Sequence, residues 1–88
     1  MRKTMSEQMD EIAGLVEVVV RPLIDFPDEL DISASESEDG GIYVEIRVNA
    51  QDTGKVIGRQ GRIIKAIRTL ARAAASSTNT SVEVEIIE

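Results

Sequence analysis

A helical stretch interrupted by two glycines constrains the fold of this chain more than any other feature. Apolar residues recur at helical spacing over residues 51–75, but Gly58 and Gly61 break the pattern in its first half. Glycine adopts left-handed backbone conformations without a steric penalty, so the chain can reverse sharply there. The segment therefore predicts two helices joined by a tight turn.

Three segments of alternating apolar and polar residues predict a small β-sheet. Residues 30–34 and 42–48 flank a polar loop that ends in Gly40 and Gly41, which is typical of an antiparallel hairpin. Residues 82–86 alternate in the same way and predict a third strand. Because the two helices between the second and third strands are long enough to cross over, we expect these two strands to lie parallel. The hairpin and the parallel strand together make a mixed sheet.

The N-terminal part of the chain predicts an amphipathic helix over residues 6–26. Pro22 falls inside this pattern, so we expect a kink or a tightened final turn there, and Pro27 should end the helix. The β-branched run at residues 18–20 could also suit a strand, but the helical spacing extends to either side of it. Its apolar arc consists of Met9, Ile12, Val16, Val19, Val20 and Leu23.

These elements predict one α+β domain over residues 1–88, with the order α-β-β-α-α-β and frayed residues at 1–5. Each predicted strand has one apolar face, so we expect the helices to pack on one face of the three-stranded mixed sheet and water to cover the other.

The composition disfavours an enzyme. The chain has no cysteine and no histidine, which removes thiolate nucleophiles, Ser-His triads and most zinc sites. We therefore expect no catalytic residue, no metal and no cofactor. No apolar run approaches the roughly 20 residues that span a bilayer, and residues 1–10 lack the apolar core of a signal peptide. This indicates a cytoplasmic protein with no membrane partner.

The positive charges are concentrated in one segment, although the net charge of the chain is -6. Residues 55–72 contain six basic residues and no acid, which leaves four basic and sixteen acidic residues elsewhere. The segment carries +6 and the remainder -12. Because a field decays over about 8–10 Å at physiological salt, this local patch can bind an anion. The six are Lys55, Arg59, Arg62, Lys65, Arg68 and Arg72.

The helix after Gly61 has an apolar arc, which we expect to lie in the core, and a basic arc, which we expect to form a stripe of positive charge. The unpaired amides at its start and the positive end of its dipole suit a phosphodiester, with Arg59 and Arg62 beside them. A solvated helix face after a simple turn explains the same pattern about equally well. The apolar arc comprises Ile63, Ile64, Ile67, Leu70, Ala71 and Ala74, and the basic arc Arg62, Lys65, Arg68 and Arg72.

Residues 57–67, with the sequence IGRQGRIIKAI, resemble the I-G-x-x-G-x-x-I-x-x-I core of a KH domain. The order of elements is that of the type II, bacterial form. Residues 54–62, followed by Ile67 and Arg68, are similar to the small single-domain KH proteins of the KhpA (YlqC-like) group. The resemblance covers about residues 7–88. It departs from the pattern at Pro22 and at Ile63, where a small or polar residue is expected.

This resemblance implies a non-catalytic protein that binds about four unpaired nucleotides of single-stranded RNA in a narrow groove. The phosphate clamp would be Gly58, Arg59, Gln60 and Gly61. Lys55, Arg62 and Lys65 would add electrostatic attraction. Val56, Ile57 and Ile64 would line an aliphatic floor, although a place in the core suits Ile57 and Ile64 about equally well.

An alternative is a KH-fold module that dimerises or docks to a protein, with weak or no RNA binding. Members of the resembled group are associated with self-pairing and with pairing to a second KH protein, and neither excludes RNA. The open face of the sheet offers Tyr43 among acids, so it lacks the aromatic platform of RRM-type binders. Phe26 is interpreted as a packing residue, and Glu83 and Glu85 as a solvated or edge-protecting face.

Overall fold

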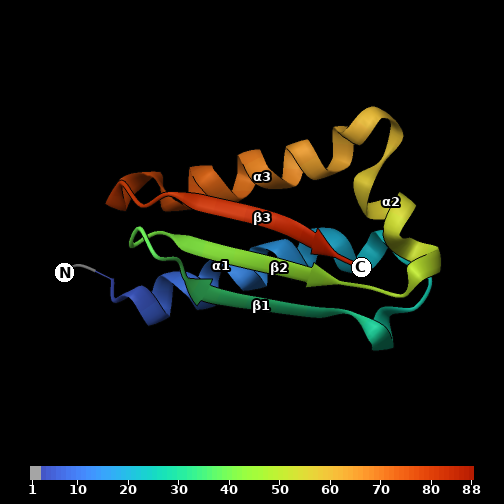
Figure 1. The fold of residues 1–88 in the computed structure, drawn as a ribbon, viewed down its shortest axis with the longest axis horizontal. Coiled ribbons are helices and arrows are strands. Elements are labelled where there is room, and N and C mark those ends of the chain that lie inside the picture. The colour runs from blue at the N-terminus through green and yellow to red at the C-terminus, as the bar shows by residue number, and fades with distance from the viewer. Residues whose placement is uncertain (1–2) are drawn as a thin grey trace.

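The fold consists of two long helices on one face of a three-stranded sheet, with a short helix beyond the end of the strands (Figure 1). It is given by a computed structural model that describes residues 3–88. The strand order is β1-β2-β3, with β1 antiparallel to β2 and β2 parallel to β3. The α+β class, the element order and the mixed sheet are therefore as predicted. The elements are α1 (Met5–Val20), β1 (Asp31–Glu36), β2 (Ile42–Arg47), α2 (Thr53–Ile57), α3 (Arg62–Ala75) and β3 (Val82–Ile87).

The core lies between the apolar face of the sheet and the helices α1 and α3. Ile42, Val44 and Ile46 of β2 are buried, and β2 is the central strand. The prediction for α3 was wrong at Leu70, which is 44% exposed, and at Ala74, which is also exposed. The helix turns a narrower arc toward the sheet than the sequence suggested. That arc consists of Ile64, Ile67, Ala71 and Ala75.

The first helix begins earlier and ends earlier than predicted. The side chain of Thr4 accepts a hydrogen bond from the Glu7 amide and caps the helix, so α1 starts at Met5, inside the segment expected to be frayed. The rest of that expectation concerns residues 1–2, which lie outside the described residues. At the other end, Arg21–Leu23 form a single 3-10 turn, which confirms the tightened turn expected at Pro22.

The chain between α1 and β1 is a connection, not the end of a helix. Ile24 is extended and buried, while the Phe26 side chain is 38% exposed. Phe26, interpreted from the sequence as a packing residue, is therefore not part of the buried core. Its position is held through its backbone amide, as described below. Within residues 3–88, no helix is long and apolar enough to cross a membrane.

Candidate nucleic-acid interface

The loop between α2 and α3 is built from backbone conformations that favour glycine. Gly58 ends α2 at φ 77° and ψ 173°, and Gly61 precedes α3 at φ 74° and ψ 16°. Between them, Gln60 takes φ 58°, which is uncommon for a residue with a side chain. The Gly61 amide donates to the Gly58 carbonyl at 3.1 Å, which closes the loop into one tight turn.

Ile63 packs directly over Gly58. A Cβ atom at position 58 would lie 2.6 Å from Cγ1 of Ile63, well inside van der Waals contact. The large apolar side chain at position 63, which departs from the expected pattern, therefore fills the space that the missing side chain of Gly58 leaves. The loop and the first turn of α3 are locked together by this contact.

The start of α3 has the features of an anion site. Its N-cap residue is Gly61, which has no side chain to accept hydrogen bonds from the first-turn amides. The first turn contains no acidic residue, so nothing offsets the positive end of the helix dipole. Arg59, Arg62 and Lys65 are exposed around it, and Arg62 Nη2 donates to Gln60 Oε1 at 3.2 Å. The amides of Gly61 and Arg62 already donate to the Gly58 and Arg59 carbonyls, so the exposed cations and the positive end of the helix dipole are the features that would attract an anion here.

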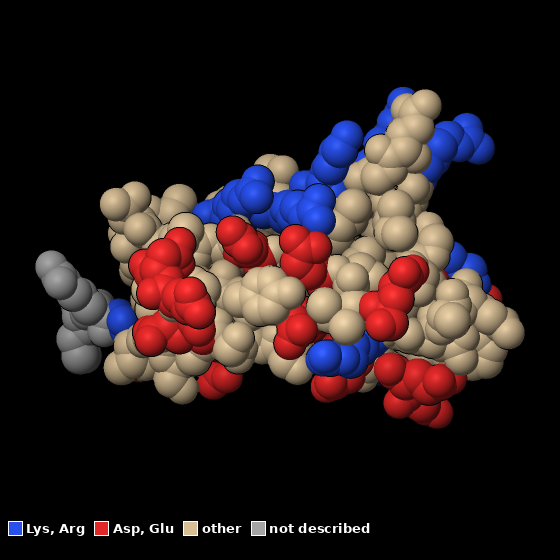
Figure 2. Space-filling view, in the orientation of Figure 1, with Lys and Arg blue, Asp and Glu red and all other residues tan. Residues whose placement is uncertain are grey.

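The basic segment divides into two groups with different contacts. Arg68 Nε donates to the Val84 carbonyl at 3.1 Å, and Arg72 Nε donates to the Val82 carbonyl at 3.4 Å. Both carbonyls belong to β3, an edge strand. The far half of the predicted basic arc therefore covers the sheet edge instead of forming a freely solvated stripe. Figure 2 shows the basic side chains gathered along the α3 side of the molecule.

Lys55 also has protein partners. Its Nζ atom forms a hydrogen bond with the Asp25 carboxylate and lies 3.3 Å from Oδ1 of Asp52. Its positive charge is therefore partly offset, whereas the sequence predicted a free cation at this position. Across residues 3–88, no ion pair engages Arg59, Arg62 or Lys65. Four described cations have no carboxylate partner: these three lie at the loop and the first turn of α3, and Arg72, which donates to the Val82 carbonyl, lies in the last turn.

The predicted aliphatic floor is only partly accessible. Val56 is 0% exposed, so its assignment to the floor is wrong: the inward face of the short helix α2 places it in the core. Ile64 is 6% exposed and also belongs mainly to the core. Ile57 is 38% exposed and is the member of the three that can contact a ligand.

Asp52 supports this site and was not identified from the sequence. Its buried carboxylate accepts hydrogen bonds from the Asp25 amide at 3.0 Å and the Phe26 amide at 2.9 Å. It thereby ties the connection after α1 to the helix that leads into the loop. An acid before a helical stretch is usually a helix cap, but Asp52 makes no such cap. Sequence pattern alone would have given it the wrong role.

Low pH should weaken the stabilisation that the Asp52 carboxylate provides. Burial, the largest single influence, raises the pKa of Asp52, but the amides of Asp25 and Phe26 and the charge of Lys55 together outweigh it and lower that pKa. Because the folded-state pKa lies below the unfolded value, the stabilisation is complete above about pH 4 and is lost as the pH falls through the folded pKa. We expect wild type to be more stable than Asp52→Asn at neutral pH, and this difference to shrink below about pH 4. Denaturant titrations across this range measure it; a difference that does not change with pH would contradict the assignment.

The open face of the sheet is acidic. Tyr43 lies beside Glu83 of β3, and Glu45 of β2 beside Glu85. Partial burial, followed by the three nearby glutamates, raises the pKa of Tyr43, so the phenol stays neutral. Figure 2 shows acidic side chains spread over this face. A phosphodiester backbone would be repelled here and attracted at the loop.

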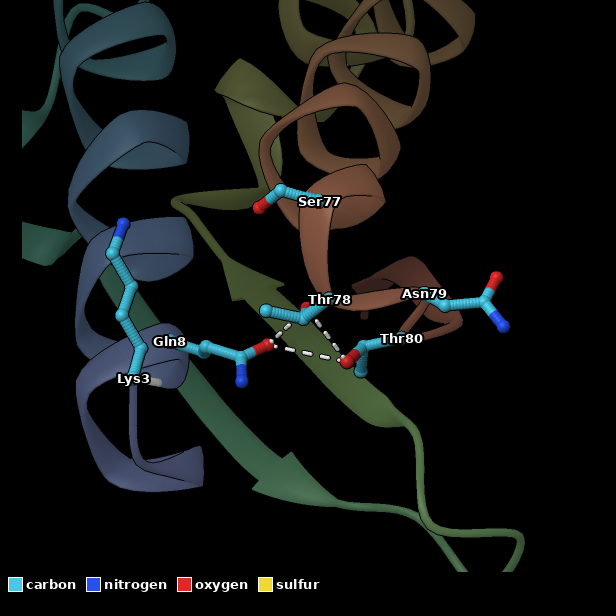
Figure 3. A pocket seen from close by; sticks show the side chains of 6 residues that line it. All are labelled: Lys3, Gln8, Ser77, Thr78, Asn79 and Thr80. Carbon is cyan, nitrogen blue, oxygen red and sulfur yellow. Dashed lines mark hydrogen bonds between the residues drawn. The ribbon is translucent and has the colours of Figure 1, made fainter. Parts of the chain in front are cut away.

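A polar cleft of about 440 Å³ lies at the opposite end of α3, between the start of α1 and the turn before β3 (Figure 3). Gln8 Oε1 accepts from Thr78 Oγ1 at 2.9 Å and from Thr80 Oγ1 at 3.2 Å. These contacts join the two segments. The cleft lies apart from the residues of the loop site.

Comparisons with known proteins match most of this chain to one family. A family model described as "KhpA/KhpB, KH domain" matches residues 13–86. A protein of Borreliella burgdorferi named RNA-binding protein KhpA is 45% identical over 84 residues, which cover 96% of this chain and 100% of that protein. A protein of the same name from Clostridium acetobutylicum is 49% identical over 83% of this chain and 96% of its own length. The Listeria monocytogenes protein of that name is 42% identical, with 84% and 96% coverage.

Proposed function

The chain belongs to the KhpA/KhpB family of KH domains, and we propose on this basis that it binds RNA and catalyses no reaction. The relatives that cover most of the chain are named RNA-binding proteins. Two observations on this molecule support the proposal: three of the four described cations without a carboxylate partner lie at the loop and the first turn of α3, and the open sheet face is acidic. An RNA strand is thereby directed to one edge of the domain.

We propose further that the loop holds the phosphates of about four unpaired nucleotides. Gly58, Arg59, Gln60 and Gly61 form the clamp, because they lie where the uncapped amides of α3 begin. Arg62 and Lys65 add positive charge from the first turn of α3. The bases lie against Ile57, which has the exposed aliphatic surface that Val56 and Ile64 lack. The observation that carries this assignment is the uncapped, acid-free start of α3.

Pairing with a second copy or with another KH protein is a second proposal. Leu70 on α3 is 44% exposed and Val18 on α1 is 71% exposed, and both are large apolar side chains in water. Neither belongs to the loop. A dimer formed through these helices would therefore leave two phosphate clamps accessible, and two coupled weak sites bind more tightly than one through effective concentration.

The groove hypothesis predicts a preference for single strands. A site made of one loop, one helix start and one exposed aliphatic side chain admits bases that are splayed out, which a duplex does not offer. In a competition titration, an unstructured RNA should displace a labelled strand at a concentration about tenfold or more below that of the same sequence in a duplex. A duplex that competes equally well or better would rule out the groove.

A further inference from the structure

Lys55 is close enough to the loop to act on its ligand. It precedes Gly58 by three residues of α2, which corresponds to a rise of about 4.5 Å along the helix. The backbone of Lys55 is thus within one Debye length, about 8 Å at physiological salt, of the end of the helix, and its long side chain could carry a free charge toward phosphate at the loop. The charge is not free, because two carboxylates face it.

The two carboxylates differ in what else they hold. Asp52 is buried and also accepts the backbone amides of Asp25 and Phe26, so it is part of the framework. The side chain of Asp25 is 71% exposed, and Lys55 is the partner that its carboxylate has among the described residues. The Asp25 carboxylate can therefore swing away from Lys55 without breaking any other hydrogen bond or ion pair among the described residues, whereas the Asp52 carboxylate is fixed by the two backbone amides.

We propose that Asp25 competes with RNA phosphate for Lys55 and thereby lowers the affinity of the loop for RNA. This rests on the proposed function, and it makes Asp25 a residue that tunes binding without contacting the ligand. When a phosphate reaches the loop, Lys55 Nζ exchanges the exposed Asp25 carboxylate for the phosphate, while the buried Asp52 carboxylate stays fixed by its two backbone amides. Exposed ion pairs are weak enough for such an exchange.

The competition between Asp25 and phosphate should change the RNA affinity by a measurable factor. The strength of exposed ion pairs corresponds to factors of about two to five in an equilibrium constant, so Asp25→Asn should tighten RNA binding by about two- to fivefold at low salt. If Lys55 then neutralises one additional phosphate, the slope of log affinity against log salt should become steeper by about 0.7. The gain should fade as salt screens the charge.

The test is a fluorescence-anisotropy titration of a short labelled oligouridylate at several salt concentrations. Wild type, Asp25→Asn, Lys55→Gln and the double variant form a cycle. Asp28→Asn is the matched control: it removes the same charge three residues away, on an exposed side chain that pairs with no cation in the described part of the chain. Thermal unfolding followed by circular dichroism checks that each variant is folded.

We expect Asp25→Asn to bind more tightly and with a steeper salt slope, Asp28→Asn to match wild type, and the gain to vanish in the Lys55→Gln background. Unchanged affinity in Asp25→Asn would overturn the proposal, as would an equal gain in Asp28→Asn or a gain that survives loss of Lys55. In each of these cases wild type still binds the oligouridylate. Absence of binding by wild type under the same conditions would instead count against the proposed function.

Discussion

Replacing Arg59 and Gln60 together with aspartate should weaken RNA binding by at least about tenfold while the domain stays folded. The change puts negative charge where phosphate is expected and leaves both glycines of the loop in place. Both side chains are exposed, and surface substitutions usually change the free energy of unfolding by no more than about 0.5 kcal/mol each. At position 60 the backbone has φ 58°, a region that aspartate tolerates better than most residues. Repulsion is therefore the main effect.

The control places aspartates at the far end of α3, through Ser77→Asp and Asn79→Asp. Both residues are exposed, and Asn79 also has a positive φ, of 55°. The 14 residues of α3 separate this end from the loop by about 20 Å, roughly two Debye lengths. This variant should bind RNA almost as well as wild type. If the loop variant is folded by circular dichroism and binds single-stranded RNA with unchanged affinity, the loop is only a turn.

The fold could be predicted from sequence because local patterns and the topology agree. Alternation identified the strands, and the long connection through two helices implied that β2 and β3 are parallel. The sequence predictions were wrong where the apolar periodicity continued past the end of a helix or beyond the buried face of a helix. The helical spacing reached Phe26, but the backbone leaves the helix after Val20. Leu70 fitted the apolar arc of α3, yet the sheet covers only the part of that arc centred on Ile67 and Ala71.

The candidate site was harder to predict because its properties depend on partners distant in sequence. The sequence already predicted the glycines and the neighbouring cations as one group, since they are contiguous in the chain. The partners of Lys55, Arg68 and Arg72 were not, because a carboxylate 30 residues earlier and two backbone carbonyls of β3 leave no local pattern. For the same reason, the burial of Val56 could not be read from the sequence of so short a helix.

Gly58→Ala should have the largest effect on stability of any single change in the loop. Two costs add at this position. The backbone angles, φ 77° and ψ 173°, lie in a region that is open almost only to glycine, and the new Cβ would meet Cγ1 of Ile63 at 2.6 Å. Strain of the first kind costs about 1–3 kcal/mol and overpacking a similar amount, so the free energy of unfolding should fall by about 2–4 kcal/mol. RNA binding should also weaken. Either the loop backbone or Ile63 must move to relieve the strain, and both movements would shift the start of α3.

Two other glycines serve as references for Gly58→Ala, because alanine can be introduced at each of them in the same way. At Gly61, φ is 74° but a Cβ would meet no atom closer than 3.9 Å, so Gly61→Ala carries only the backbone cost of about 1–2 kcal/mol. Gly14 lies inside α1 with ordinary helical angles and open space around it, and Gly14→Ala should raise stability by about 0.5–1 kcal/mol. Chemical denaturation of the three variants measures the series. Gly58 differs from Gly61 both in its ψ angle, 173° against 16°, and in the contact with Ile63, so the loss should be larger at Gly58, and equal losses at these two positions would show that Ile63 does not lock the loop to α3.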